Sequence, residues 1–238
     1  MSNAPKDASE KTYQENFVAE LAKFKWQTPD FLNGNQQKVT VQSLIDNWRS
    51  ELNRLNNDQL EGIPLTDGEF AQVMSKVGQI SNSYEAAKVL AMEEGKGKID
   101  GIYRDSHPQV TRKQITLTIF KKAEVRGGES SYQVAREVET PNGNRFDIVL
   151  LINGLPLINI EQKRTDKSID EAFGQFQRYY RDGEYTNNFM AFSQMMVVTT
   201  EIETRYFATP KTVNDFNPAF VFHWSDRDNK RINDWKKV

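Results

Sequence analysis

The sequence predicts an α/β or α+β fold in which a helical first part leads into a mixed central β-sheet flanked by helices. Two observations predict this class. Apolar residues recur at helical spacing in the first 92 residues, whereas period-two alternation and near-continuous apolar runs dominate from residue 115 onward. The chain of 238 residues is long enough to bury a core without disulfide bonds or structural metals.

Four helices are expected in the first part, because one face of each segment is apolar. The third is the best defined, since Thr66 is followed three residues later by Glu69 in the pattern of a capping box. Ser83 is the expected cap of the fourth helix, and the Gly- and Lys-containing segment 94–98 ends it. The expected helices cover residues 13–24, 41–55, 66–77 and 83–92.

Strands dominate the second part of the chain. Residues 115–120 and 132–138 alternate apolar and polar side chains, as half-buried strands do. Residues 146–152 and 156–160 are almost continuously apolar, which suits central strands that are covered on both faces. The prediction is completed by a helix over residues 168–181 and by short strands over 195–199, 205–208 and 220–224.

We expect one main domain over residues 12–225, with a helical part at about 12–95 and a sheet-based part at about 100–225. Residues 1–11 are small, polar and charged, and are predicted to form a flexible lead-in. Residues 226–238, rich in Asp, Arg and Lys, are predicted to form a linker. The sequence contains no internal repeat and no Gly-x-x-x-x-Gly-Lys-Ser/Thr loop for binding ATP.

Composition excludes several classes of function. The sequence has no cysteine and two histidines, so it offers no thiolate zinc site, cysteine nucleophile or multi-histidine metal site. It has no apolar run of about 18 residues and no apolar leader, so neither a membrane span nor a signal peptide is expected and a cytoplasmic location is the default. The formal net charge is −2, whereas nucleic-acid binders are usually basic. A nucleic-acid partner would therefore be held by a local patch or by other subunits.

Three charged residues interrupt the most apolar stretch of the sequence, namely Asp147, Glu161 and Lys163. A buried charge costs several kcal/mol unless it is paired or binds a metal, so two interpretations are open. In the first, Lys163 neutralises a carboxylate in a buried ion pair. In the second, the two carboxylates on adjacent strands bind a hard cation such as Mg²⁺. Lys163 would then orient a water molecule or offset charge on a phosphate.

The metal-site hypothesis makes a geometric prediction about the hairpin at Asn153-Gly154. A regular two-residue turn would set Asp147 opposite Ile160 and direct Glu161 to the opposite face of the sheet. A single site therefore requires an odd-length loop or one β-bulge, with Gly154 able to take the left-handed position of the bulge. A regular hairpin would count against the site.

Two further groups of residues are candidates for the same site. Gln175 and Tyr179 are four residues apart and share a face of the expected helix, with Arg178 beside them. Such a pair is more often a polar helix edge, but it could also contact a nucleic acid. The first helix contains Glu15 and Glu20, and Glu20 borders the apolar face. Most glutamates in such positions are merely solvated, and Glu20 is a candidate additional acid only through the resemblance described below.

The spacing Asp147…Glu161-x-Lys163 matches the Asp…(Asp/Glu)-x-Lys signature of the PD-(D/E)xK nucleases. The surrounding segments resemble more specifically the N-terminal nuclease region of the R subunit of type I restriction–modification enzymes. The segments that carry this resemblance are residues 146–157, 160–163, 171–179 and 204–208. One departure is Gln162, which stands where the family often has an apolar residue.

The resemblance implies a restriction-endonuclease-like fold and a Mg²⁺-dependent endonuclease, with Mn²⁺ as a substitute, that cuts double-stranded DNA at a variable distance from the recognition site. Asp147 and Glu161 would carry catalysis as metal ligands, and Lys163 would act on the attacking water or the phosphate. Glu20 and the backbone carbonyl of Gln162 are implied as further metal ligands. The residues implied to contact DNA or brace the site are Gln175, Tyr179 and Arg178.

The resemblance also implies partners. They are double-stranded DNA, the motor domain of the same full-length subunit, and the methyltransferase and specificity subunits, with ATP acting only through the motor domain. The sequence ends before any motor motif, which suggests a fragment or an isolated nuclease domain. Two other functions remain open: a catalytically silent docking or DNA-binding module of the same complex, and a glycosidase with two carboxylates, which would leave Lys163 unexplained.

Overall fold

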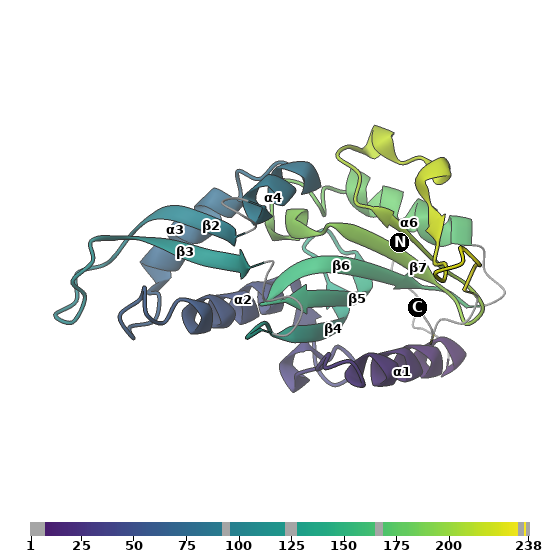
Figure 1. The fold of residues 1–238 in the computed structure, drawn as a ribbon, viewed down its shortest axis with the longest axis horizontal. Coiled ribbons are helices and arrows are strands. Elements are labelled where there is room, and N and C mark those ends of the chain that lie inside the picture. The colour runs from purple at the N-terminus through teal and green to yellow at the C-terminus, as the bar shows by residue number, and fades with distance from the viewer. Residues whose placement is uncertain (1–7, 92–95, 122–127, 165–168, 233–235, 237–238) are drawn as a thin grey trace.

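A mixed seven-stranded sheet forms the centre of the computed structural model (Figure 1), with strand order β1-β4-β5-β6-β7-β8-β9. The structure describes residues 8–91, 96–121, 128–164, 169–232 and 236. The strands of this sheet are β1 (Val39–Thr40), β4 (Tyr132–Glu139), β5 (Arg145–Ile152), β6 (Leu155–Gln162), β7 (Met195–Thr199), β8 (Thr204–Ala208) and β9 (Phe222–His223). The β1–β4 and β6–β7 pairs are parallel and the remaining pairs antiparallel, so the predicted mixed sheet is confirmed.

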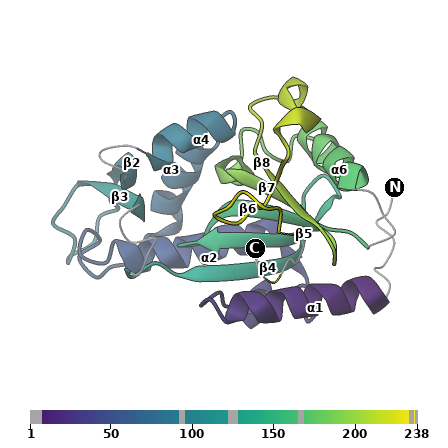
Figure 2. The same ribbon diagram turned by 45° about the vertical axis from the view of Figure 1, so that its right-hand side comes forward.

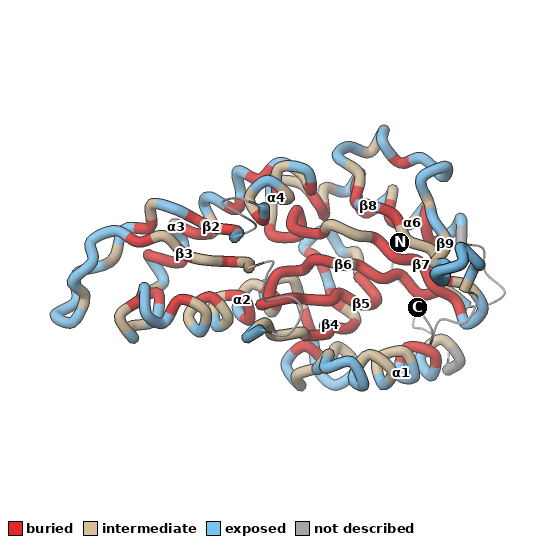
Figure 3. Tube along the Cα trace, in the orientation of Figure 1, coloured by how far each residue is buried: buried red, intermediate tan, exposed pale blue. Residues whose placement is uncertain are grey.

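Helices cover both faces of this sheet (Figures 1 and 2). Helix α1 (Ala8–Ala22) packs its apolar residues against one face, where they meet Ile148, Ile160 and Val197. Helices α2 (Val41–Leu55) and α6 (Ile169–Arg181) contribute to the larger core on the other face, which includes Val149. Buried residues are concentrated in β4–β7 and in the helices that face them (Figure 3).

One of the two predicted helix caps is confirmed and the other is wrong. Helix α3 (Asp67–Val77) has the expected capping box between Thr66 and Glu69. Helix α4 (Ser83–Leu90) is capped by Asn82 and not by Ser83, because the Asn82 side chain accepts the N–H groups of Tyr84 and Glu85. The predicted end of this helix at Met92 lies outside the described residues.

The start of α1 differs from the prediction. The helix begins at Ala8, so residues 8–11 belong to it and not to a lead-in, while residues 1–7 lie outside the described part of the chain. Those first helical residues have no apolar periodicity, but tertiary contacts one turn later fix the helix. The hydroxyl of Tyr13 is 2.8 Å from Thr199 Oγ1 and donates to the carbonyl of Thr200 at 2.8 Å.

A second, two-stranded sheet was predicted only in part. Strand β3 (Gln114–Lys121) was expected, whereas β2 (Lys96–Tyr103) begins in the segment 94–98 that was expected only to end a helix. The two strands pair antiparallel and do not join the central sheet. We call residues 96–121 the arm, since this hairpin extends away from the sheet (Figure 1).

The predicted linker is described only over residues 226–232 and 236. Residues 226–232 form a turn closed by a β-bridge between Ser225 and Arg231. In the described part of the chain, no helix is both long and apolar enough to cross a membrane.

Candidate active site

The hairpin that joins β5 to β6 contains the predicted irregularity. Next to the turn, Leu151 pairs with Pro156, but the following pair joins Leu150 to Ile158, so Leu157 is an extra residue on β6. This bulge shifts the register by one and sets Ile148 opposite Ile160. One residue further along, this register sets Asp147 opposite Glu161 and not opposite Ile160. The two acids therefore share a face of the sheet, as a single site requires.

The bulge does not lie in the turn where Gly154 was expected to form it. Asn153 and Gly154 both have positive φ angles, 53° and 76°, as the two central residues of a type I′ turn require. A Cβ atom on Gly154 would lie 2.8 Å from the Cα of Trp48, so α2 packs directly against this turn. The irregularity follows two pairs later.

Asp147 and Glu161 lie just beyond the last paired residues of β5 and β6. The β5–β6 ladder stops at Ile148, whereas β6 continues beside β7 as far as Gln162. Asp147 Oδ2 accepts the backbone N–H of Gln162 at 2.7 Å. Asp147 and Glu161 are 4% and 1% exposed, so both acids are held in a site of low solvent access.

Lys163 lies at the same end of β6. Its backbone N–H donates to the Thr199 carbonyl at 2.9 Å, and its Nζ is 3.0 Å from Glu161 Oε1. Burial alone would lower the pKa of Lys163, but the charges of Glu161 and Asp147 outweigh burial and raise that pKa above its ordinary value. The side chain therefore carries a positive charge next to Glu161.

Helix α6 supplies two polar side chains to the site. The Gln175 amide donates to Glu161 Oε1 and to the Tyr179 hydroxyl. That hydroxyl donates in turn to the Arg145 carbonyl at 2.7 Å, at the start of β5. Burial, with the charges of Glu161 and Asp147, raises the pKa of Tyr179 well above its ordinary value, so the hydroxyl keeps its proton. Gln175 and Tyr179 thus bridge the two strands of the site.

The structure places Arg178 and Glu20 away from these contacts. Arg178 is exposed, with its guanidinium carbon 5.5 Å from the centre of the Tyr179 ring. Glu20 lies with Phe17 and Leu21 over the face of the sheet that α1 covers, and its carboxylate is 2.6 Å from Lys23 Nζ. Glu20 therefore does not join Asp147 and Glu161, contrary to expectation. The first turns of α1 lie near the site, whereas Glu20 is on its last turns.

The sequence analysis missed an acid on the first turns of α1. Glu10 lies one turn before Tyr13, whose hydroxyl contacts Thr199 and Thr200 at the end of β7. The negative charge of Glu10 also contributes to raising the pKa of Lys163. A contact of Tyr13 with a distant strand could not be read from a helical pattern, and this contact determines which end of α1 lies near the site.

A second missed group lies behind Asp147. The Gln14 amide is buried, donates to Glu137 Oε1 at 2.7 Å and accepts from Arg136 Nη2 at 2.8 Å. Glu137 has a positive φ of 52°, which is strained for a residue with a Cβ, and its carboxylate is 2.9 Å from Arg145 Nε. This network fixes the start of β5 on the side away from α6.

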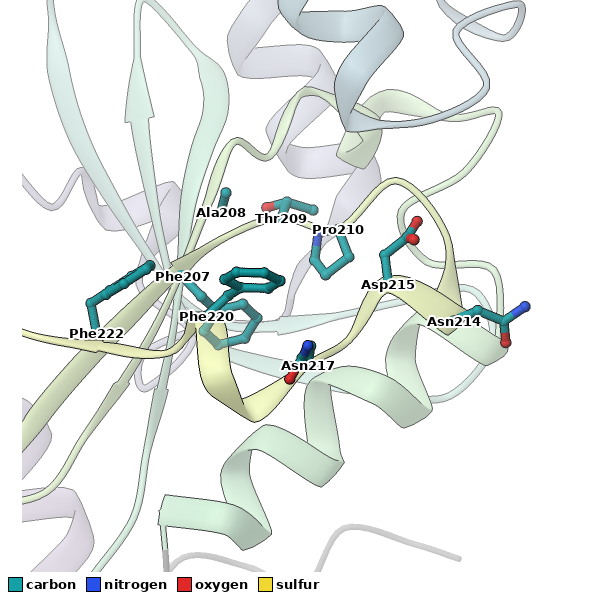
Figure 4. A pocket seen from close by; sticks show the side chains of 9 residues that line it. All are labelled: Phe207, Ala208, Thr209, Pro210, Asn214, Asp215, Asn217, Phe220 and Phe222. Atoms are coloured by element: carbon teal, nitrogen blue, oxygen red, sulfur yellow. The ribbon is translucent and has the colours of Figure 1, made fainter.

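A separate cavity lies between β8 and the segment that contains the short helices η4 (Val213–Asp215) and η5 (Pro218–Phe220), and is shown in Figure 4. Its volume is about 550 Å³, and its lining includes the rings of Phe207, Phe220 and Phe222. Its one acid, Asp215, accepts hydrogen bonds from Thr212. The cavity therefore lacks the paired carboxylates found between β5 and β6.

The chain matches the family described as type I restriction enzyme R protein N terminus over residues 7–215. The match includes the whole of the site and almost the entire central sheet. The chain belongs to this family.

Relatives of this R protein segment are endonuclease subunits of type I restriction enzymes. One from Staphylococcus aureus is 34% identical over 202 residues, which is 83% of this chain and 20% of that protein. One from Staphylococcus saprophyticus is 30% identical over 226 residues, 93% of this chain and 22% of that protein. The EcoprrI subunit of Escherichia coli is 28% identical over 208 residues, 82% of this chain and 59% of that protein. The chain thus spans about a fifth of the length of the staphylococcal relatives.

The residues gathered in this R protein segment fit a hard divalent cation. Asp147, Glu161 and Lys163 together carry a formal charge of −1, and carboxylate oxygens are the ligands that Mg²⁺ prefers. The described residues contain no group of three His, Cys, Asp or Glu side chains placed to share an ion. A cation held here would keep several waters.

Proposed function

We propose that this chain is the Mg²⁺-dependent nuclease domain of a type I restriction enzyme R subunit and that it hydrolyses phosphodiester bonds of double-stranded DNA. The observation that carries the proposal is the bulged hairpin, which brings Asp147, Glu161 and Lys163 together although a regular turn would separate them. A purely structural ion pair would need only one of the two acids. The names of the relatives support the same class of activity.

In this proposal, Asp147 and Glu161 hold the cation, with the Gln162 carbonyl as a further ligand. When bound, the cation supplies a water of lowered pKa and stabilises negative charge on the phosphate. Lys163 positions the water or offsets the charge that develops on the phosphate oxygens as the P–O bond breaks. Gln175 keeps Glu161 in place through its amide, so that the carboxylate need not reorganise during the reaction.

The proposal assigns sequence recognition and DNA translocation to other parts of the enzyme. DNA is cut at a variable distance from the recognition site when a motor domain of the same subunit stalls, and the specificity and methyltransferase subunits read the DNA sequence. The site itself offers carboxylates, one ammonium and an amide, which suit a phosphate and an ion and give no basis for reading bases.

The test uses a full-length subunit that contains this segment, assembled with its methyltransferase and specificity subunits. Lys163→Ala should abolish cleavage of plasmid DNA while ATP hydrolysis continues, because the motor does not depend on this side chain. Lys23→Ala, on an exposed lysine of α1, is the matched control and should cut normally. Normal cleavage by Lys163→Ala would refute the proposal. Cleavage by neither the variant nor the unmodified enzyme, with ATP hydrolysis intact, would favour a silent docking module.

A further inference from the structure

We propose that the outer face of the arm, residues 96–121, is a contact surface for duplex DNA, separate from the candidate active site. The choice of DNA as the partner rests on the proposed function. The geometry and the charge of the arm are independent of the proposed function.

The arm concentrates positive charge in a chain that is otherwise acidic. Residues 96–121 contain six basic and two acidic side chains, a net charge of +4, whereas the whole chain carries −2. The rest of the chain therefore carries −6. One of the six basic side chains, Arg104, is buried and paired with Glu69, so the other five supply the positive charge of the surface. A local patch of this kind is what a nucleic-acid partner requires when the overall balance is not basic.

The two faces of the arm differ in character. Gly97, Ile99 and Ile102 of β2 are buried, as are the alternate residues Ile115 and Leu117 of β3. They belong to the side of the hairpin that packs on α2, α3 and α4. No helix or strand of the described chain packs as a layer on the opposite side (Figures 1 and 2).

The outer side presents donors that suit phosphates and base edges. Lys98 stands opposite Thr118, and the exposed Tyr103 stands opposite Gln114. Lys96 and Lys113 are exposed, at the start of β2 and next to the start of β3. Lysine, threonine, glutamine and tyrosine are among the side chains that form polar contacts with the DNA backbone.

The acidic side chains of the arm are engaged within the protein. Asp100 Oδ1 accepts from Thr116 Oγ1 at 2.9 Å, and the Asp105 carboxylate accepts from the Thr66 hydroxyl. A partner with phosphate groups therefore meets a face whose two acids accept hydrogen bonds from threonine hydroxyls of the protein.

The arm is held rigidly at its far end. Arg104 Nε is 2.8 Å from Glu69 Oε1, and both side chains are 1% exposed. The Tyr103 N–H donates to Gln72 Oε1 at 2.9 Å, and the Gln72 amide donates back to the Tyr103 carbonyl at 2.9 Å. A braced ribbon loses little conformational freedom on binding.

The test measures binding of the 238-residue chain to a fluorescein-labelled 30-base-pair duplex by fluorescence anisotropy, over a series of salt concentrations. The arm variant combines Lys96→Gln, Lys98→Gln and Lys113→Gln. The control combines Lys23→Gln, Lys211→Gln and Lys230→Gln, which removes the same charge from lysines outside the arm. We expect the arm variant to lose roughly tenfold or more in affinity and to reduce the salt slope by about two to three, while the control stays near the unmodified chain.

Equal losses in both variants, or no binding by the unmodified chain at low salt, would overturn the proposal. Equally strong binding of poly-glutamate through the same lysines would also overturn it, because the arm would then be a face for acidic proteins. Calorimetric binding of Mn²⁺ by the arm variant separates this proposal from the proposed function. It should be unchanged, since Asp147 and Glu161 are untouched, and its absence in every form of the chain would count against the nuclease site and not against the arm.

Discussion

At the scale of single residues, the site is a problem of buried charge. Asp147 and Glu161 are both more than nine-tenths buried, and like charges in such a place repel each other strongly. The Gln162 N–H stabilises Asp147, whereas Lys163 and Gln175 stabilise Glu161. These partners hold the two acids in place, although Lys163 is the one cation among the three charged residues of the motif.

Glu10 and Glu20 provide a matched comparison on the same helix. Glu10→Gln should weaken Mn²⁺ binding by roughly three- to tenfold, because it removes a negative charge that acts on Lys163 and the site. Glu20→Gln should leave binding unchanged, since Glu20 lies over the other face of the sheet and pairs with Lys23. Calorimetry of both variants makes the comparison. Equal effects, or a larger effect of Glu20→Gln, would contradict the position assigned to α1.

The sequence allowed Asp147, Glu161 and Lys163 to be predicted as a group, because charges inside apolar strands demand partners. The same argument could not choose among Glu10, Glu15 and Glu20. Each lies on a helix whose distance from the sheet end depends on one long-range contact, that of Tyr13 with Thr199. Nor could a pattern reveal Gln14, whose buried amide is defined by contacts with a strand far along the chain.

At the scale of elements, the hairpin between β5 and β6 decides which residues meet. Its type I′ turn favours regular pairing, and the extra residue Leu157 then shifts the register. The turn itself is fixed by its close packing against Trp48 on α2. The bulge was predictable from chemistry, since only an irregular hairpin brings the two acids together, but its place on β6 was not.

Gly154→Ala should destabilise the protein clearly more than Gly143→Ala. Both glycines have positive φ angles, 76° and 81°, so alanine at either position costs about 1–2 kcal/mol of backbone strain. Only at Gly154 does the new Cβ also meet backbone, 2.8 Å from the Trp48 Cα, whereas nothing lies within 4 Å at Gly143. Urea unfolding with equal m-values measures the difference. Equal losses would show that α2 does not hold the turn.

The brace of the arm can be tested in the same way. Glu69→Ala should lower the free energy of unfolding by about 3–5 kcal/mol, because it leaves Arg104 buried without its partner. Glu85→Ala breaks an ion pair with Lys88 whose side chains are 40% and 55% exposed, and should change stability far less, because water screens an exposed pair. A loss at Glu69 as small as that at Glu85, measured by urea unfolding, would mean that the arm is not anchored by this pair.

The helices and strands with strong periodicity were predicted close to their observed bounds, as α2 and β4–β7 show. Strand β2 was not predicted, because it begins with Lys-Gly-Lys, a sequence that is typical of a loop. Its pairing with β3 buries Ile99 and Ile102 against the helices, and this tertiary packing outweighs the weak local preference. Local composition carries no information about such packing.

At the scale of the whole molecule, charge and length fit a part of a larger assembly. The net charge of −2 does not favour DNA, and the positive charge is gathered on the arm, at the opposite end of the molecule from the separated ends of β5 and β6 (Figure 1). A duplex held at both places would lie along the long axis of the domain.

The most direct test of the central claim is calorimetric titration of the chain with Mn²⁺ and Mg²⁺, with and without duplex DNA. We predict binding to the unmodified chain and its loss in both Asp147→Asn and Glu161→Gln, each of which should remain folded by circular dichroism because the amides keep the shape of the acids. Failure of the unmodified chain to bind either metal even with DNA present, or undiminished binding by both variants, would contradict the claim that these two carboxylates form a metal site.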